Sequence, residues 1–489
     1  MATPVFNLQS GTSMLKQLSE VEFARRTAGG ARTPVFQEFI ADRETPVSVL
    51  TRVADTDAAV FLLESVSGGA SRGRYSYLGL DPERLVTEDA GADPLPALRA
   101  AVQDRPFTPA PELPSLQGGA IGYFAYDVVG TFTPRVGRVL VREPGTPTAN
   151  FLVTDTLVIF DNVRQTVLIS KVAGTGGYAQ AMADIAALAE RLLSAESIAR
   201  YVQAHGAAPQ PTLEEFTSEM SAVEFAEMVR KCQAAIRAGE VIQIVPSQKF
   251  TARTDLSAIA LYRALRVVNP SPYNFFLKLG DRTLIGSSPE ELVKLEHGIA
   301  STCPIAGTRP RGRTAAEDAM LEKELLADPK ERAEHVMLVD LGRNDLGRVC
   351  EIGSVKVDRY AFVERYSHVM HLVSQVRGRL AAPYDAFDLL KATFPAGTLS
   401  GAPKVRAMEL IAEFEKSPRG VYGGAVGYFS YTGDMDFAIV IRTMQLAHGT
   451  LTLRAGAGIV ADSNQVKEYE ETVNKAKALF EAARFAATL

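Results

Sequence analysis

Two segments of the chain each carry a pair of glutamates three residues apart. Glu331 and Glu334 lie in ADPKERAEHVMLVDLGRND (327–345), and Glu468 and Glu471 lie in QVKEYEETVNK (465–475), which ends in Lys475. In a helix this spacing puts both carboxylates of a pair on one face. Such carboxylates suit Mg²⁺, a hard cation that prefers oxygen ligands, binds one or two carboxylates directly and keeps waters for the rest.

Each pair also has a structural interpretation. Asp328 is a candidate helix N-cap with Pro329 at the first helical position, so Glu331 at the third would complete a capping box. The second pair and Lys475 equally fit a solvated, salt-bridged helix face. Glu334, in contrast, enters the apolar stretch HVMLV, where a carboxylate needs a partner or a metal. The spacing alone leaves both interpretations open.

Two glycine-rich segments imitate nucleotide-binding motifs without their context. GTLSGAPK (397–404) lacks the GxxxxGK[ST] spacing, and Pro403 precedes its lysine. GAGIVA (456–461) matches GxGxxA, yet it continues the alternating run TLTLRAGAGIV instead of opening a helix. The chain also lacks a GxSxG elbow and a cysteine flanked like a glutaminase nucleophile. We therefore expect neither nucleotide binding nor glutamine hydrolysis.

Composition excludes several classes of protein. The 489 residues are 46% hydrophobic and 22% charged, so a large core can form and a disordered or collagen-like chain is excluded. The formal net charge of −5 at pH 7 favours neither nucleic acid nor an anionic membrane as partner, so any anionic ligand must be held by local cations. No apolar run is long enough to span a membrane and no signal peptide is recognisable, so we expect a cytoplasmic protein. Three scattered cysteines suggest neither disulfides nor zinc.

The elements that must position these residues fall into two parts. Residues 1–45 read as a polar lead-in, 46–202 as a β-rich N-terminal domain ending in a helix over 179–202, 203–216 as a linker and 217–489 as a second domain. In the second domain we expect helices near 222–238, 315–342, 384–392, 403–415 and 465–487, and strands near 241–250, 273–278, 283–287, 366–377, 422–430, 436–444 and 451–460. Short turns between strands, such as DNVRQ (161–165), favour antiparallel pairing, which predicts an α+β fold. The last helix should bury a stripe of Val466, Tyr469, Val473, Ala476 and Phe480.

Six segments together resemble a known family. They are PIAGTRPRG (304–312), DLGRNDLGRV (340–349), RYSHVMHLVS (365–374), FPAGTLSGAPKVRAMELI (394–411), GAVGYFSYTGDMDFAIVIRT (424–443) and RAGAGIVADSNQVKEYEETVNK (454–475). From about residue 45 to 485 the chain resembles the chorismate-utilising enzymes, most closely the branch that forms anthranilate. The resemblance implies large antiparallel β-sheets packed together with helices on the outside, in two intertwined parts, with 217–489 as the chorismate-binding catalytic domain.

The resemblance also implies a reaction. Members of this branch convert chorismate and ammonia to anthranilate and pyruvate through an aminated isochorismate-type intermediate, the first committed step of tryptophan biosynthesis, with Mg²⁺ as cofactor. The ammonia comes from a separate glutamine amidotransferase subunit, component II, in a heterotetramer of two large and two small subunits. That division of labour agrees with the missing glutaminase nucleophile.

By the same resemblance, individual residues acquire roles. Glu334 and Glu471 match direct Mg²⁺ ligands, and Glu331 and Glu468 match ligands that act through water. Glu290 of SSPE (287–290) matches the general acid for the departing C4 hydroxyl, a role that a pKa raised by burial would suit. The positions that match substrate-binding residues are Thr308, Tyr422, Arg442, Gly456 and Gly458, with Lys475 balancing charge near the metal.

Two of these assignments have structural alternatives. Glycines at 456 and 458 allow a ligand to approach the backbone, although they could equally serve a bend. His371 lies in an alternating strand, where a lone histidine is usually a hydrogen-bonded core residue. The resemblance instead gives His371 the elimination of pyruvate, while His368, on the opposite face, is interpreted as structural.

Two positions distinguish branches of the family. Ala306 stands where aminodeoxychorismate synthases carry a lysine, and Gln243 stands where isochorismate and salicylate synthases carry a lysine that activates water. Ammonia needs no deprotonation before it attacks, so an amide suffices at 243. His371 argues against an enzyme that releases the aminated intermediate. The alternatives that remain are an aminodeoxychorismate synthase, an aminodeoxyisochorismate synthase, which stops at the aminated intermediate, and a non-catalytic regulatory subunit.

LLES (62–65) and NPSPY (269–273) resemble the family's feedback site for tryptophan. The residues expected to contact the inhibitor are Glu64, Ser65, Pro272, Tyr273 and Asn274. Asn274 departs from the methionine common at this position, so a polar side chain there could weaken or reshape inhibition.

Overall fold

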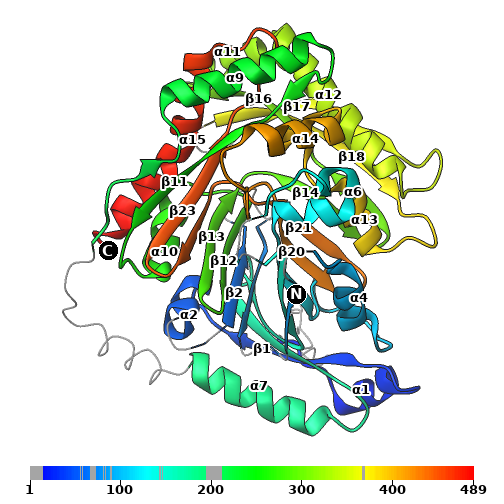
Figure 1. Ribbon diagram of the computed structural model, residues 1–489. Coiled ribbons are helices and arrows are strands. Elements are labelled where there is room, and N and C mark those ends of the chain that lie inside the picture. The colour runs from blue at the N-terminus through cyan, green and yellow to red at the C-terminus, as the bar shows by residue number, and fades with distance from the viewer. Residues whose placement is uncertain are drawn as a thin grey trace, which may run out of the picture.

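The computed structural model describes residues 15–54, 57, 59–65, 73–80, 82, 84–88, 91–142, 145, 147–193, 212–365 and 369–489. Two large antiparallel sheets dominate this part of the chain (Figure 1). The first has eleven described strands, in the order β1 (Thr33–Ile40), β8 (Thr166–Ala173), β7 (Thr156–Asp161), β3 (Tyr75–Leu80), β2 (Ala59–Glu64), β12 (Tyr273–Leu279), β13 (Arg282–Ser288), β22 (Thr443–Ala447), β23 (Thr450–Gly456), β11 (Ser247–Arg253) and β9 (Thr217–Ser218).

The second sheet has ten described strands. Nine follow the order β16 (Ile305–Pro310), β18 (Val369–Arg379), β15 (Ile299–Thr302), β14 (Glu291–Glu296), β21 (Met435–Ile439), β20 (Ala425–Ser430), β5 (Gly119–Phe124), β6 (Ala149–Thr154) and β4 (Arg84–Glu88), and β17 (Lys356–Arg365) also pairs with β18. A separate short ladder joins β10 (Gln243–Ile244) to β19 (Gly401–Ala402).

Helices lie around the sheets. They are α1 (Glu20–Thr27), α2 (Pro46–Val53), α4 (Leu95–Gln103), α5 (Val129–Phe132), α6 (Pro134–Gly137), α7 (Tyr178–Leu193), α9 (Ala222–Arg237), α10 (Ala258–Val268), α11 (Ala315–Ala327), α12 (Pro329–Gly347), α13 (Ala386–Thr393), α14 (Lys404–Phe414) and α15 (Gln465–Ala486), with 3₁₀ turns η1 (Tyr126–Val128) and η2 (Gly397–Leu399). In Figure 1, α1 and α7 lie at the lower end, whereas α9, α11, α12 and α15 gather at the upper end.

Both large sheets mix strands from the two halves of the chain. β2 pairs with β12, with Leu62 opposite Phe276, and β5 pairs with β20, with Gly122 opposite Gly427. The α+β fold of packed antiparallel sheets with two intertwined parts is therefore confirmed. The linker expected at 203–216 lies outside the described residues up to position 211, so the domain boundary stays a prediction.

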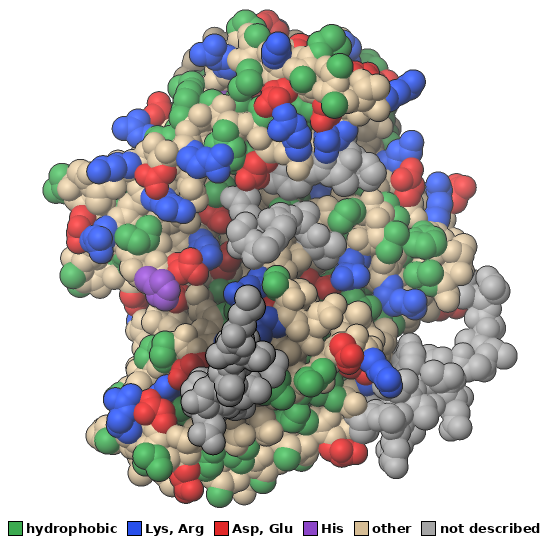
Figure 2. Space-filling view, turned by 180° about the vertical axis from the view of Figure 1, so that it is seen from behind, with side chains coloured by type: hydrophobic (Ala, Val, Ile, Leu, Met, Phe, Trp, Pro, Cys, Tyr) green, Lys and Arg blue, Asp and Glu red, His purple; other side chains and the backbone are tan. Residues whose placement is uncertain are grey.

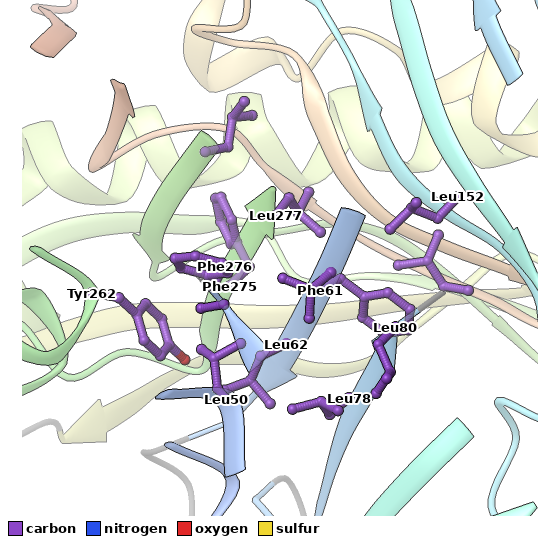
Figure 3. Packing of buried hydrophobic residues seen from close by; sticks show 14 of the residues in the cluster. Leu50, Phe61, Leu62, Leu78, Leu80, Leu152, Tyr262, Phe275, Phe276 and Leu277 are labelled. Carbon is purple, nitrogen blue, oxygen red and sulfur yellow. The ribbon is translucent and has the colours of Figure 1, made fainter. Parts of the chain in front are cut away.

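Glycines opposite phenylalanines allow tight packing where the two halves meet. Gly79 lies opposite Phe61, and Gly286 lies opposite Phe275. A Cβ atom would come within 2.2 Å of the Phe61 ring at position 79 and within 2.0 Å of the Phe275 ring at position 286. Only glycine leaves room for these rings. Phe61 and Phe275 belong to the buried cluster of Figure 3.

Two expected elements are each divided in the structure. The helix expected over 315–342 is α11 followed by α12, because Asp328 caps the start of α12 with hydrogen bonds from the backbone N–H groups of Lys330 and Glu331. The strand expected over 436–444 is also two strands. β21 lies in the second sheet and β22 in the first, and the chain crosses between them at Arg442, whose φ is +49°. That left-handed conformation is unusual for a residue with a side chain.

The buried stripe expected on the last helix is wrong in part. Val466 is 64% exposed, and Tyr469, Val473 and Phe480 are only partly buried. Ala476 is buried as expected, but Thr472, Leu479, Ala482, Ala483 and Ala486 provide the rest of the buried face. Helix α10 was not expected, and its buried face includes Leu261 and Leu265.

Surface properties agree with the composition. No helix in the described part of the chain is long and apolar enough to cross a membrane. Figure 2 shows acidic and basic side chains interspersed over the rear face, without a single sign dominating. The described side chains visible on this face form no strongly basic patch of the kind that nucleic acid favours.

Candidate active site

Glu290 lies just before β14, with its carboxyl group packed inside the protein. The hydroxyl of Thr398, in η2, donates a hydrogen bond of 2.7 Å to Glu290 Oε1. Burial raises the pKa of Glu290 to about 7, against the lowering effects of the Thr398 hydrogen bond and the charge of Lys475. A carboxyl group in this state can donate a proton near neutrality.

The first glutamate pair lies on α12 as expected. The Glu331 N–H donates to the capping Asp328 carboxylate, but the Glu331 carboxylate lies 3.4 Å from Arg309 Nη1. Glu334, one turn on, accepts a hydrogen bond of 3.2 Å from the side-chain amide of Gln243 in β10. The expected capping box is therefore wrong in part: Asp328 accepts from the Glu331 N–H, but the Glu331 carboxylate faces Arg309 instead of returning to the helix start.

The second pair lies on α15, which Asn464 caps. Lys475 forms an ion pair of 2.7 Å with Glu471 and donates a hydrogen bond of 3.1 Å to the carbonyl of Gly456. Burial and the neighbouring charge of Glu471 raise the pKa of Glu468, although Ser463 and the charges of two lysines oppose this. Two carboxylates that disfavour each other's charge suit a cation.

The two pairs flank one short backbone segment, 456–458. A Cβ atom on Gly458 would lie 2.9 Å from the Gln243 side-chain nitrogen, the atom that donates to Glu334. Lys475 connects Glu471 to Gly456 on the same segment. In the described part of the chain, no three His, Cys, Asp or Glu side chains lie close enough together to hold a metal.

Tyr422 lies beside this segment, and the charge of Arg442 acts on Tyr422. A Cβ atom on Gly456 would come within 2.8 Å of the Tyr422 hydroxyl, so glycine is needed there. Burial raises the pKa of Tyr422 to about 12, which keeps the phenol protonated. Burial also lowers the pKa of Arg442, which makes no ion pair among the described residues. A partly buried guanidinium without a carboxylate partner is suited to an anionic ligand.

His371 in β18 faces Thr308 in β16. His371 Nδ1 lies 3.0 Å from the Thr308 hydroxyl and 3.2 Å from the Gly307 carbonyl. Burial lowers the pKa of His371 and the charge of Arg442 acts in the same direction, while the Gly307 hydrogen bond opposes them. With its proton on Nδ1, facing the carbonyl, the neutral imidazole keeps Nε2 as its basic nitrogen. His368 lies outside the described residues.

The residues expected to bind an inhibitor line a cavity of about 1410 Å³ between the two sheets. They are Glu64, Ser65, Pro272, Tyr273 and Asn274. Glu64 is buried, accepts a hydrogen bond from Tyr262 and lies 3.1 Å from Arg266 Nε. Asn274 lies opposite Glu64 in the β2–β12 pair and donates to the Ser271 carbonyl. The sequence thus identified a set of residues that share one cavity.

Sequence reasoning missed three residues that organise the site. Thr398 received no role, although it bonds Glu290. Lys404, in the same GTLSGAPK segment, forms a 2.7 Å ion pair with Asp345 of α12. Arg419 is buried and donates to the carbonyls of Leu399 and Val245. The proximity of this segment to the SSPE turn was not visible in its spacing.

Comparison with known proteins gives consistent results. Residues 59–481 match the family described as chorismate binding enzyme. Anthranilate synthase component 1 of Mycolicibacterium smegmatis is 44% identical over 98% of this chain and 96% of its own length, and that of Streptomyces coelicolor is 47% identical over 92% and 89%. The crystal structure of anthranilate synthase component I from Streptococcus pneumoniae has a TM-score of 0.73 and 38% identity, covering 85% of this chain and 94% of that chain. The isochorismate synthase MenF of Escherichia coli, at 20% identity and a TM-score of 0.71, shares the fold.

Proposed function

This chain belongs to the chorismate binding enzymes, in the branch of anthranilate synthase component 1, and on that basis we propose that it converts chorismate and ammonia to anthranilate and pyruvate. The observation that carries the proposal is the Glu290 carboxyl group, which accepts a 2.7 Å hydrogen bond from the Thr398 hydroxyl and whose pKa, raised by burial to about 7, suits the protonation of a leaving hydroxyl. The positive charge of Lys475 acts on Glu290 and lowers its pKa. Lys475 also pairs with Glu471 and donates a hydrogen bond to the Gly456 carbonyl.

Substrate binding needs groups that match the charges of chorismate. Arg442 and the Tyr422 hydroxyl are proposed to hold the carboxylate of the enolpyruvyl group, together with N–H groups near Gly456 and Gly458 and the Thr308 hydroxyl. Glu334 and Glu471 would hold Mg²⁺ directly and Glu331 and Glu468 through water; the all-oxygen donor set and the raised pKa of Glu468 beside Glu471 fit that ion. When bound, Mg²⁺ would supply Lewis-acid polarisation of the ring carboxylate.

Amination is the first step. Glu290 donates its proton to the C4 hydroxyl, which leaves as water, while the lone pair of ammonia forms the new bond at C2. Gln243 offers a neutral amide beside Glu334 and no base for water. Ammonia does not need such a base, so this position favours amination over hydroxylation.

Elimination of pyruvate is the second step. His371 is proposed to support it, since its neutral imidazole can accept a proton through Nε2 while Nδ1 faces Gly307. Loss of pyruvate makes the ring aromatic, which drives the step. Retention of His371 favours anthranilate as the product over a released aminated intermediate.

The partner and the regulator follow from the same proposal. Ammonia would come from a glutamine amidotransferase, component II, in a heterotetramer of two large and two small subunits. Tryptophan would inhibit by binding in the cavity that Glu64, Ser65 and Asn274 line. We place the protein in the cytoplasm, as a biosynthetic enzyme.

The decisive experiment is direct. Chorismate, ammonium and Mg²⁺ are incubated with the chain, anthranilate is followed by its fluorescence and pyruvate by a coupled assay, and the reaction is repeated with EDTA. We expect equal amounts of both products and their loss with EDTA or with Glu471→Gln, but not with Glu470→Gln, an exposed neighbour on α15. An aminated intermediate, an aminodeoxychorismate product, or tryptophan binding by an inactive wild-type chain would each contradict the proposal.

A further inference from the structure

A small cavity of about 50 Å³ has Glu290 in its wall. One face of α12 lines it with Leu338, Leu341, Gly342 and Asp345, and the end of α13 and the segment that follows it through η2 line it with Thr393, Ala396, Gly397 and Thr398. This is room for a few waters, and carboxyl and hydroxyl groups in the wall offer them hydrogen bonds. The cavity thus connects the candidate general acid with Asp345 of α12, and Glu291 of β14 and Cys303 line it as well.

Asp345 and Lys404 form an ion pair at this cavity. Lys404 Nζ lies 2.7 Å from Asp345 Oδ2 and donates 3.1 Å to the carbonyl of Thr393, another residue of the cavity wall. The side chains of Asp345 and Lys404 keep 15% and 13% exposure, so the pair is mostly buried but still reaches water. Burial raises the pKa of Asp345, while Lys404 and Arg348 act against it.

In the proposed reaction Glu290 loses a proton in every turnover and must regain it. Each amination breaks the C4–O bond and transfers the Glu290 proton to the leaving oxygen, which departs as water. Glu290 remains as a carboxylate and must regain a proton before the next turnover, while the new ammonium group releases its surplus proton to solvent. A site closed by chorismate offers Glu290 little contact with bulk water.

Building on the proposed function, we propose that the cavity beside Glu290 holds the water through which Glu290 regains its proton, and that Asp345, held by Lys404, positions this water. Glu290, Thr398 and Asp345 all line this cavity, and the Asp345 side chain keeps 15% exposure to solvent. The alternative role for the Asp345–Lys404 pair is a purely structural tie between α12 and α14.

Single-turnover kinetics separate these roles. Below pH 7 Glu290 is mostly protonated before substrate arrives, so the first turnover needs no proton recovery. For Asp345→Asn we expect a first turnover within about twofold of wild type, followed by a steady-state rate lower by about tenfold, seen as a burst of anthranilate in rapid-quench experiments. The solvent deuterium isotope effect on the steady-state rate should rise. Asp340→Asn, an exposed residue of α12 paired with Arg343, is the matched control and should show neither change.

A second variant protects the test against misfolding of Asp345→Asn. Gly342→Ala adds a methyl group to the cavity wall, 3.1 Å from Thr302 Cγ2 and 3.5 Å from Pro304 Cγ, and suits the interior of α12. It should give the same burst because it displaces water. If the folded variants slow the first turnover and the steady state equally, or change neither, the proposal is wrong. If wild type makes no anthranilate at all, the proposed function fails first.

Discussion

Gln243 donates a hydrogen bond of 3.2 Å to Glu334 across 91 positions of the chain. The donor is a neutral amide, so it brings no positive charge that would compete with a cation at Glu334. Gly458 lies against the same amide nitrogen, where a Cβ atom would come within 2.9 Å. One side chain therefore links the α12 glutamates to the segment that approaches α15.

Replacing the Gln243 amide with a lysine amine should disturb the site mainly through the added positive charge, because the two side chains are similar in length. Gln243→Lys would put an ammonium group on Glu334, compete with Mg²⁺ and add a base that favours water as nucleophile. We expect anthranilate formation to fall by about tenfold or more and the Mg²⁺ concentration for half-maximal activity to rise. Gln243→Met, of similar length but uncharged, is the comparison. Equal losses in both variants would mean that shape, not charge, matters at this position.

The pH dependence of the reaction should report Glu290. Its pKa is raised from 4.5 to about 7, so the acid form dominates below pH 7 and is lost as pH rises through that value. With free ammonia held constant, kcat/KM should fall by about tenfold per pH unit on the alkaline side. Thr398→Val removes a hydrogen bond that lowers this pKa, so the alkaline limb should move to higher pH. A limb that stays in place or moves down would exclude Glu290 as the titrating acid.

The four glutamates should differ in their response to Mg²⁺. Glu334→Gln and Glu471→Gln remove the charges of the two proposed direct ligands and should abolish activity at any Mg²⁺ concentration tested. Glu331→Gln and Glu468→Gln change the two ligands proposed to act through water, and should raise the half-maximal Mg²⁺ concentration by about tenfold while leaving activity at saturation. The measurement is a Mg²⁺ titration of the rate, with Glu470→Gln as control. Four identical responses would contradict the division into direct and water-mediated ligands.

Features within one element could be predicted from the sequence. The helical spacing of Glu331 and Glu334, the cap at Asp328 and the turn at 161–165 depend on neighbours a few residues away, and all appear in the structure. Arg442 is the counterexample. The alternating run FAIVIRT favours one continuous strand, but the chain leaves one sheet and enters the other at this residue.

Contacts between elements that are far apart in the sequence could not be predicted from the sequence pattern. Thr398 bonds Glu290 across 108 positions, and Lys404 pairs with Asp345 across 59. Thr398 and Lys404 both belong to the segment GTLSGAPK (397–404), whose residue spacing indicated only that it is not a phosphate-binding loop. The roles of Glu290, His371 and Gln243 came from the family resemblance, since an isolated glutamate, histidine or glutamine carries no periodic signal.

Asn274 should limit inhibition by tryptophan. Its side chain is 2% exposed, and its Oδ1 atom has no hydrogen-bond partner among the described residues, which is an unfavourable state for a buried polar atom. Asn274→Met replaces it with an apolar side chain that can contact an indole ring. We expect tryptophan to bind about tenfold more tightly. The chain contains no tryptophan, so the fluorescence of added tryptophan reports binding directly.

Two further variants complete the tryptophan-binding measurement. Glu64→Gln, in the same cavity, should weaken binding if this cavity is the inhibitor site. Gln445→Met, a partly buried position in β22 and outside the lining residues of this cavity, is the control and should leave affinity unchanged. Unchanged affinity in both cavity variants would place the inhibitor elsewhere.

Arg419 joins the loops that present several candidate residues. Its side chain is 2% exposed, pairs with Glu415 at 2.6 Å and donates to the carbonyls of Leu399, next to Thr398, and of Val245, two residues after Gln243. The guanidinium also lies over the Tyr422 ring, 5.6 Å from its centroid. Because its donors point in several fixed directions at once, lysine cannot replace them.

Arg419→Lys should therefore destabilise the fold and disturb catalysis together. Loss of the hydrogen bonds to Leu399 and Val245 leaves buried carbonyls without a donor, which we expect to lower the free energy of unfolding by about 3 kcal/mol. Since Thr398 and Gln243 would shift with these loops, kcat should fall by about tenfold or more at a temperature where the variant is still folded. Chemical denaturation and steady-state kinetics measure the two effects. Arg343→Lys, exposed on α12, should change unfolding by less than about 0.5 kcal/mol. A stable Arg419→Lys with normal kcat would mean that the two loops keep their positions without this guanidinium.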